Sequence, residues 1–113
     1  MEPIAEWHLH ASKQGSARIP VCLTVYRPQA QPESTCSLYQ TFVEIKGISA
    51  KPRHVSGVSS LQSMVLALRI LQVYVESALN HGWLFYIDDT DSPVDAASLI
   101  FENRADDAGL DRD

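Results

Sequence analysis

The stretch SSLQSMVLALRILQVYVESALNH, residues 59–81, decides the fold because it is the one long helical pattern in the chain. Ser59 can cap the first turn, and Gln62 stands three residues later, where its side chain can reach back to the cap. Gly82 follows the pattern and is the residue type that commonly ends a helix. The sequence therefore predicts one helix from the cap at Ser59 to His81.

The predicted helix has one polar stripe and a wide apolar surface. The polar residues recur three, four or seven positions apart: Gln62, Arg69, Gln72, Glu76 and Asn80. The opposite face carries Met64, Leu68, Leu71, Val75 and Leu79. Further apolar side chains flank that face, so the arc is wider than the roughly 100° of an ordinary surface helix, and we expect most of it to be buried. Polar residues interrupt the run before the roughly 20 apolar residues that a membrane span needs.

Apolar and polar residues alternate before the helix, which indicates half-buried strands. The predicted strands cover residues 4–11, 19–26, 37–46 and 51–56. The apolar run at 83–87 is either a fifth strand, which we favour, or the end of the helix docking back on the sheet. A turn at 88–93 and a short helix at 94–101 follow. Because strands come first and the helix late, we expect an α+β fold, an antiparallel β-meander of four to five strands with one long helix packed on one face. Residues 1–101 are predicted to form a single globular domain, and 102–113 an acidic, disordered tail.

Charge is unevenly distributed along the 113 residues, whose net charge is -5. Residues 1–87 carry a balance of +2, whereas residues 88–113 carry nine Asp/Glu and two Arg. Such an acidic end repels phosphate, which argues against nucleic-acid binding, and it favours encounter with a basic partner. Cys22 and Cys36 are too few for a disulfide framework, and the first 30 residues lack an apolar leader. We therefore expect free thiols and a cytoplasmic location.

Three segments carry a resemblance: IPVCLTVYRP at 19–28, FVEIKG at 42–47 and GVSSLQSMVLAL at 57–68. Together they resemble a family of small bacterial domains known only as uncharacterised, and the likeness spans about residues 4–90. Its most specific part is the GVSSLQ opening of the helix. The resemblance implies a compact sheet-plus-helix domain and brings no activity or site residues. In size and charge alone, the chain is also similar to immunity proteins that neutralise bacterial toxins.

Signatures of catalysis are missing from the sequence. It has no Gly-rich phosphate loop, no Gly-x-Ser-x-Gly elbow and no helical His-Glu-x-x-His. Cys22 lies in the middle of a predicted strand, where a small buried filler is the simpler interpretation than an activated thiolate. We therefore predict no catalytic residues, no cofactor and no enzyme.

Two groups of residues could suit a metal ion. His8 and His10 share one strand face, and His54 could add a third imidazole. No Cys or carboxylate accompanies this pair in sequence, and the spacing arises easily by chance, so we predict no metal ligands. The acidic run near Asp88 lacks the glycine and the closing glutamate of an EF-hand loop. A small-ligand or metal-binding domain using His8 and His10 remains the alternative.

Two surfaces are candidates for binding. One is the sheet face away from the helix, with His8, His10, Cys22, Thr24 and Tyr26; the other is an acidic surface of Asp88, Asp89, Asp91 and Asp95 with Trp83 and Tyr86. Aromatic rings beside carboxylates suit a site for a basic protein, because rings supply buried area and charge supplies specificity. The sequence therefore favours a non-enzymatic immunity or inhibitor protein that covers a basic toxin or enzyme. Pairing of two helices through Arg69 and Glu76 would give a homodimer.

Overall fold

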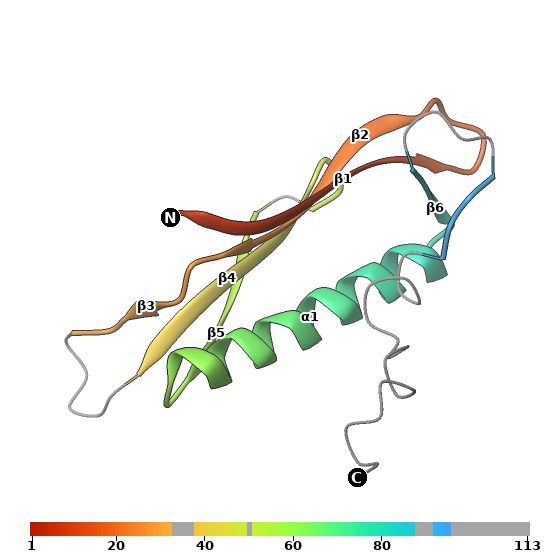
Figure 1. Cartoon of the computed structure of the whole chain (residues 1–113). Coiled ribbons are helices and arrows are strands. Elements are labelled where there is room, and N and C mark those ends of the chain that lie inside the picture. The colour runs from red at the N-terminus through yellow and green to blue at the C-terminus, as the bar shows by residue number, and fades with distance from the viewer. Residues whose placement is uncertain (33–37, 50, 88–91, 96–113) are drawn as a thin grey trace, which may run out of the picture.

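The computed structural model describes residues 1–32, 38–49, 51–87 and 92–95, which form one sheet with one helix on it (Figure 1). In chain order the elements are β1 (Pro3–Lys13), β2 (Ile19–Tyr26), β3 (Gln29–Ala30), β4 (Tyr39–Lys46), β5 (Arg53–Gly57), α1 (Ser60–Asn80) and β6 (Trp83–Tyr86). The α+β class predicted from the sequence is confirmed. Of the predicted short helix at 94–101, only Val94 and Asp95 are described, and Val94 makes an isolated bridge with Phe85. Residues 96–113, including the predicted tail, lie outside the described residues.

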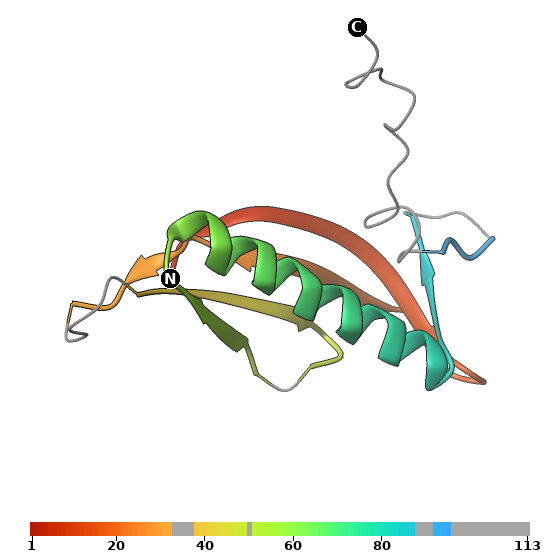
Figure 2. The same cartoon turned by 90° about the horizontal axis from the view of Figure 1, so that it is seen from below.

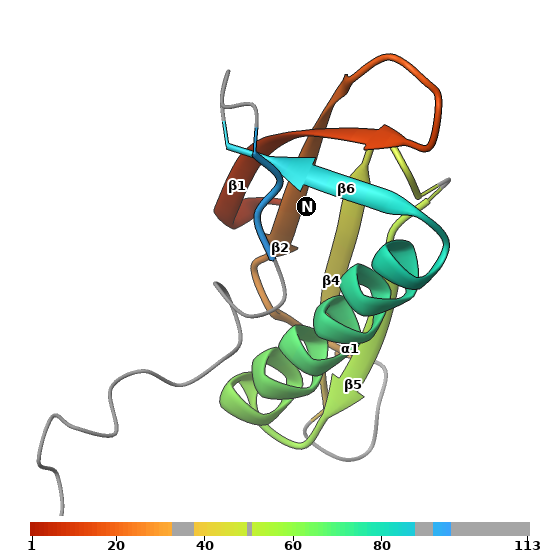
Figure 3. The same ribbon diagram turned by 90° about the vertical axis from the view of Figure 1, so that its right-hand side faces the viewer.

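The sheet is antiparallel, with strand order β3-β4-β2-β1-β6 and with β5 also paired to β4. Strands β1, β2, β4 and β5 follow one another as the predicted meander. Helix α1 then crosses one face and returns the chain to the opposite edge, where β6 pairs with the second half of β1 (Figure 3). The predicted fifth strand at the end of the helix is therefore confirmed as β6.

A tight turn sets the register of the first hairpin. Gly15 has φ +80°, a conformation that glycine adopts without strain, and the Ser16 amide donates to the Lys13 carbonyl at 2.8 Å. The strands that leave this turn pair residue for residue as far as Ala5, which places His8 opposite Cys22 and Trp7 opposite Leu23.

The start of α1 follows the predicted capping arrangement. The Ser59 hydroxyl accepts the Gln62 amide at 3.0 Å, and the Gln62 side-chain oxygen accepts the Val58 amide at 2.7 Å. The second bond thus goes to the residue before the cap rather than to the cap itself. Gly82, with φ +95°, follows the last turn as expected.

The face that α1 buries differs from the prediction. Small residues Ser63, Ala67 and Ala78 join Leu71 and Val75 at the contact with the sheet, whereas the predicted core residue Leu68 is 39% exposed. Three other apolar side chains of α1 are also exposed: Leu61, Val65 and Val73. The expectation that most of the apolar arc is buried was therefore wrong. Small side chains let the helix axis lie close to the sheet, and this close approach outweighs the larger apolar residues.

The closest approach lies where β5 runs into the helix. A Cβ atom on Gly57 would come within 2.7 Å of the Ser63 amide nitrogen, so only glycine fits under the first turn. Ser63 and Thr41 are fully buried, and their hydroxyls form a hydrogen bond of 2.7 Å. The Ser63 hydroxyl also lies 3.0 Å from the Ser60 carbonyl, which satisfies its own proton.

Helix α1 packs on one face of the sheet and covers some strands of that face more than others. Its main contacts are with β4 and β5, and it touches β2 far less, as the view from below shows (Figure 2). The core therefore fills the space between the helix and the layer formed by β2, β4 and the second half of β1. No helix within the described ranges is both long and apolar enough to cross a membrane.

Candidate functional site

Strands β1 and β2 bring three side chains of different chemistry together on the sheet face away from α1. His8 lies directly opposite Cys22, and Glu6 lies opposite Thr24. Residues that alternate with them, such as Leu9 and Leu23, belong to the core under the helix. The predicted outer face is thus confirmed for these positions. The expectation that neither a Cys nor a carboxylate accompanies His8 was wrong, because Cys22 and Glu6 both lie beside it on this face.

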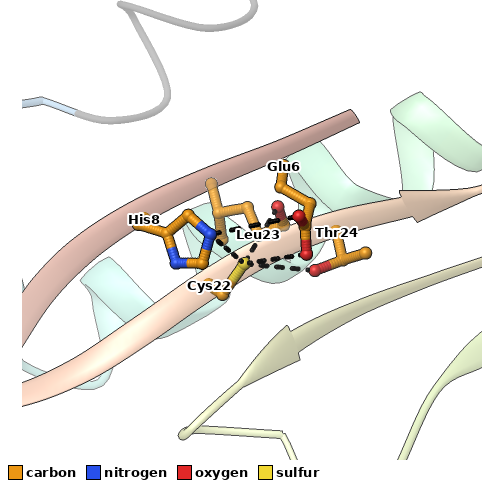
Figure 4. A network of polar contacts seen from close by, with 5 residues as sticks. All are labelled: Glu6, His8, Cys22, Leu23 and Thr24. Atoms are coloured by element: carbon orange, nitrogen blue, oxygen red, sulfur yellow. Dashed lines mark hydrogen bonds and ion pairs between the residues drawn. The ribbon is translucent and has the colours of Figure 1, made fainter. Parts of the chain in front are cut away.

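Ligand atoms of Glu6, His8 and Cys22 converge on one point (Figure 4). The Cys22 Sγ atom lies 3.8 Å from Glu6 Oε2 and 3.8 Å from His8 Nε2. His8 Nε2 lies 4.0 Å from the other carboxylate oxygen, Glu6 Oε1. With one ligand atom taken from each residue, all three atoms lie within 4.8 Å of one another. These three residues form what we call the outer-face cluster.

Donor types and spacing in the outer-face cluster suit a zinc-class ion. Thiolate sulfur, imidazole nitrogen and carboxylate oxygen are the usual ligands of Zn²⁺, with bonds of about 2.0–2.3 Å. Tetrahedral bonds of that length place neighbouring ligand atoms about 3.5 Å apart. Because one ligand atom from each residue gives separations within 4.8 Å, the set has to contract by as much as about 1 Å around an ion. Rotation of the Glu6 and His8 side chains, which reach solvent, can supply this movement.

The three residues of the outer-face cluster differ in how far they are exposed to solvent. Cys22 is 7% exposed, whereas the side chains of Glu6 and His8 are 37% and 77% exposed. The thiol is therefore fixed in the sheet, and the two other donors can close over an ion from solvent. Three protein ligands leave a fourth position for water or another ligand.

The same geometry does not match a relay that runs from a carboxylate through an imidazole to a thiol. A catalytic relay needs the carboxylate and the nucleophile on different nitrogens of the imidazole ring. Here Cys22 Sγ and Glu6 Oε1 both face Nε2 of His8. Convergence of three donors on one point is the arrangement of metal ligands rather than of a proton relay.

Polar groups continue the cluster across β2 towards β4. Thr24 Oγ1 lies 3.3 Å from the Cys22 sulfur, and the Tyr26 hydroxyl donates to Glu44 Oε1. Burial raises the pKa of Tyr26 to about 12 from the ordinary 10.0, and the hydrogen bond with Glu44 adds to the shift. Tyr26 therefore stays protonated as a donor at physiological pH.

His10 lies outside the outer-face cluster, although the sequence paired it with His8. It sits opposite Pro20 on β2 and Tyr86 on β6, two residues further along β1. Its Nδ1 atom is buried and has no hydrogen-bond partner among the described residues. The structure thus replaces the predicted partner of His8 by Cys22 and Glu6.

Cys22 was expected to be an inert filler, and no local pattern joined it to His8. One signal was available, however: a hairpin centred on Gly15 pairs residues whose numbers add up to 30, such as His8 and Cys22. Glu6 could then be recognised as the neighbouring position on the same face. The run SKQGS at residues 12–16 is typical of a turn, but a turn alone does not show which residues of the two strands face each other.

The residues predicted to bind a partner are only partly described. Asp88, Asp89 and Asp91 lie outside the described residues, and Asp95 is exposed. Tyr86 is buried, with the guanidinium of Arg18 3.7 Å from its ring centre. Trp83 is half-buried and lines a cavity of about 350 Å³ together with three basic residues, Lys13, Arg53 and His81. Within the described part of the chain, Tyr86 thus lies against a cation, and Trp83 shares a cavity with basic residues.

Known proteins do not assign a role to either surface. Comparisons with protein-family models, with curated proteins and with solved structures give no match for this chain. The resemblance to small uncharacterised bacterial domains therefore stays an expectation, and function has to be argued from the residues themselves.

Proposed function

We propose that this protein is a non-enzymatic binding protein that holds a zinc-class metal ion at Glu6, His8 and Cys22. The observation that carries the proposal is the convergence of three different ligand atoms within 4.8 Å of one another. Two of the residues come from β1 and the third from β2, so the hairpin holds the site before any ion arrives. The metal would link the two strands on the face that the helix leaves open.

Cobalt(II) is the probe that tests this proposal, because a Co²⁺–thiolate bond gives a charge-transfer absorption in the near ultraviolet. Titration of the reduced protein should give this band and saturate at one ion per chain. Cys22→Ser should abolish the band. His8→Ala should weaken binding by at least about tenfold, the loss that even an outer-shell partner can cause.

Two matched variants control for nonspecific binding. Cys36→Ser removes the other thiol, and His54→Ala removes an exposed histidine of β5. Both should bind cobalt as the unmodified protein does. A titration without the charge-transfer band, or a band that depends on Cys36 instead, would contradict the proposal.

A second candidate function is the neutralisation of a basic protein, as the sequence indicated. The observation in its favour is the charge of residues 88–113, which hold nine Asp/Glu against two Arg. Such a segment raises the association rate with a cationic partner. Reversal of Asp88, Asp89 and Asp91 to Lys should slow association with a basic toxin-like enzyme and leave cobalt binding unchanged, as measured by surface plasmon resonance. Unchanged association would exclude this surface.

A further inference from the structure

Strand β1 extends beyond β6, the strand that pairs with it at the edge of the sheet. Strand β2 pairs with β1 from Pro3 to Ala11, but β6 pairs only with His10 to Lys13. No other described strand lies beside the first half of β1. A bulge between Pro3 and Ala5 interrupts the ladder at the start of this half. The regular open edge therefore runs from Ala5 to Leu9.

The orientation of the backbone at this edge follows from a proline. His10 is opposite Pro20 on β2, and Pro20 has no N–H to donate, so the His10 backbone groups point to β6. Backbone direction alternates along a strand. The N–H and C=O groups of Glu6 and His8 therefore point the same way, past the end of β6. An added strand could bond to all four groups.

Beside the open edge lies an apolar groove on the helix side of the sheet. It has a volume of about 160 Å³ and is lined mainly by apolar side chains, which are Ala5, Trp7, Leu23, Val25, Leu68 and Leu71. Exposed apolar residues of α1 continue it: Val65 is 40% and Leu61 72% exposed. An edge strand next to exposed apolar surface is the usual condition for strand-to-strand association.

We propose that a second copy of this chain occupies this edge, with two β1 strands pairing antiparallel about a two-fold axis at Trp7. The open stretch from Ala5 to Leu9 is symmetric about Trp7, so the pairing that uses all of it is centred there. Extension by one residue would bring Ile4 against the end of β6. The bulge and β6 thus both limit the pairing to the same five residues.

Charge complementarity supports this register. With Trp7 opposite itself, Glu6 of each copy lies opposite His8 of the other copy on the outer face. Both pairs exchange backbone hydrogen bonds, and both set a carboxylate against an imidazole. The two Trp7 rings meet in a pair without backbone bonds, where side chains lie closest, above the apolar groove. Moving the two-fold axis by one residue, to Glu6 or to His8, shifts the register by two residues and sets that side chain against its own copy.

This interface differs from the pairing through Arg69 and Glu76 that the sequence suggested, and it does not rest on metal binding. The symmetry axis stands perpendicular to the sheet, so both helices lie on one face of a continuous sheet and both outer-face clusters on the other. The pairing can therefore be tested with a chelator present, apart from the cobalt titration.

Sedimentation velocity in EDTA over micromolar concentrations tests the interface, with His8→Pro as the disrupting variant. This proline removes an N–H that points to the open edge and leaves the bonds to β2 intact. The unmodified protein should sediment as a dimer. His8→Pro should sediment as a monomer, and circular dichroism should show that this variant is folded. His54→Pro is the matched control, because alternation places the His54 N–H on the outer side of β5, and it should stay a dimer.

A charge exchange tests the register separately. His8→Glu sets like charges opposite each other and should raise the dimer dissociation constant by about tenfold or more. The double variant Glu6→Lys with His8→Glu restores opposite charges and should recover dimerisation. A monomeric unmodified protein, dimers that persist in His8→Pro, or a double variant as weak as His8→Glu would each overturn the proposal.

Discussion

The two faces of the β1–β2 hairpin are built from the same two strands and behave differently. On the helix side, Leu9 and Leu23 are buried in the core, whereas on the outer side His8 is largely exposed and Cys22 sits with polar neighbours. Neighbouring residues of one strand thus have different roles, because successive side chains of a strand point to opposite faces of the sheet. We expect stability to depend mainly on the helix-side face and metal binding on the outer-face cluster, and this separation can be tested.

The largest effect is expected from the helix-side face. Phe85 of β6 is fully buried in the core, so Phe85→Ala should lower the free energy of unfolding by about 3–5 kcal/mol. Urea denaturation of the metal-free protein measures this change. Leu84 is the adjacent residue and is 44% exposed, so Leu84→Ala should change stability by no more than about 0.5 kcal/mol. Similar losses in both variants would mean that β6 does not seal the core.

At the outer-face cluster, stability should change only when metal is present. Zinc at 100 times its dissociation constant should stabilise the folded protein by about 2.7 kcal/mol, because it binds the folded hairpin alone. Thermal unfolding with and without zinc measures the shift. Cys22→Ser should remove the shift while leaving the metal-free melting temperature nearly unchanged. A zinc-induced rise that survives in Cys22→Ser would place the ion elsewhere.

Alkaline pH should weaken the outer face through Tyr26. Its pKa is about 12 in the folded protein and 10.0 ordinarily, so its stabilising contribution is complete below pH 10 and is lost as the pH rises towards 12. Between pH 9 and pH 11 the loss from this group is about 1 kcal/mol. Tyr26→Phe should lose less stability over this interval than the unmodified protein in urea denaturation. Equal losses would show that Tyr26 ionises as easily in the folded state as in the unfolded one.

The smallest effect concerns the helix end, which belongs to neither face. Ser59→Ala removes the acceptor of the Gln62 amide and should cost about 1 kcal/mol of unfolding free energy. Cobalt affinity should stay the same, because the cap does not touch the outer-face cluster. Ser60→Ala, one residue later, is the control and should change stability less. A change in cobalt affinity would show that the faces are coupled through the helix.

Much of the fold could be predicted from local patterns. The cap at Ser59, the strand alternation and the order of the elements each depend on residues close in sequence, and they predicted the sheet with its helix correctly. The prediction of the buried face of α1 was wrong because the helix lies close to the sheet at Ser63 and Ala67, where only small side chains fit. No local pattern encodes this close approach.

The outer-face cluster could be predicted only in part, for a similar reason. His8 was recognised as a candidate ligand, and its strand face was predicted correctly. Cys22 lies 14 residues away along the chain, so its meeting with His8 depends on the register of the hairpin. Periodicity determines the face of each residue and leaves its partner across the strands open.

The glycine under the first turn of α1 has a consequence for how the sequence can vary. In a saturation library selected for folded protein, position 57 should retain glycine alone, since every other residue brings a Cβ atom to 2.7 Å from a backbone nitrogen. Position 15 should also accept asparagine, because Gly15 has open space around it and only its φ of +80° is restrictive. Among the folded variants, position 57 would thus be invariant, whereas position 15 would show only a preference for glycine.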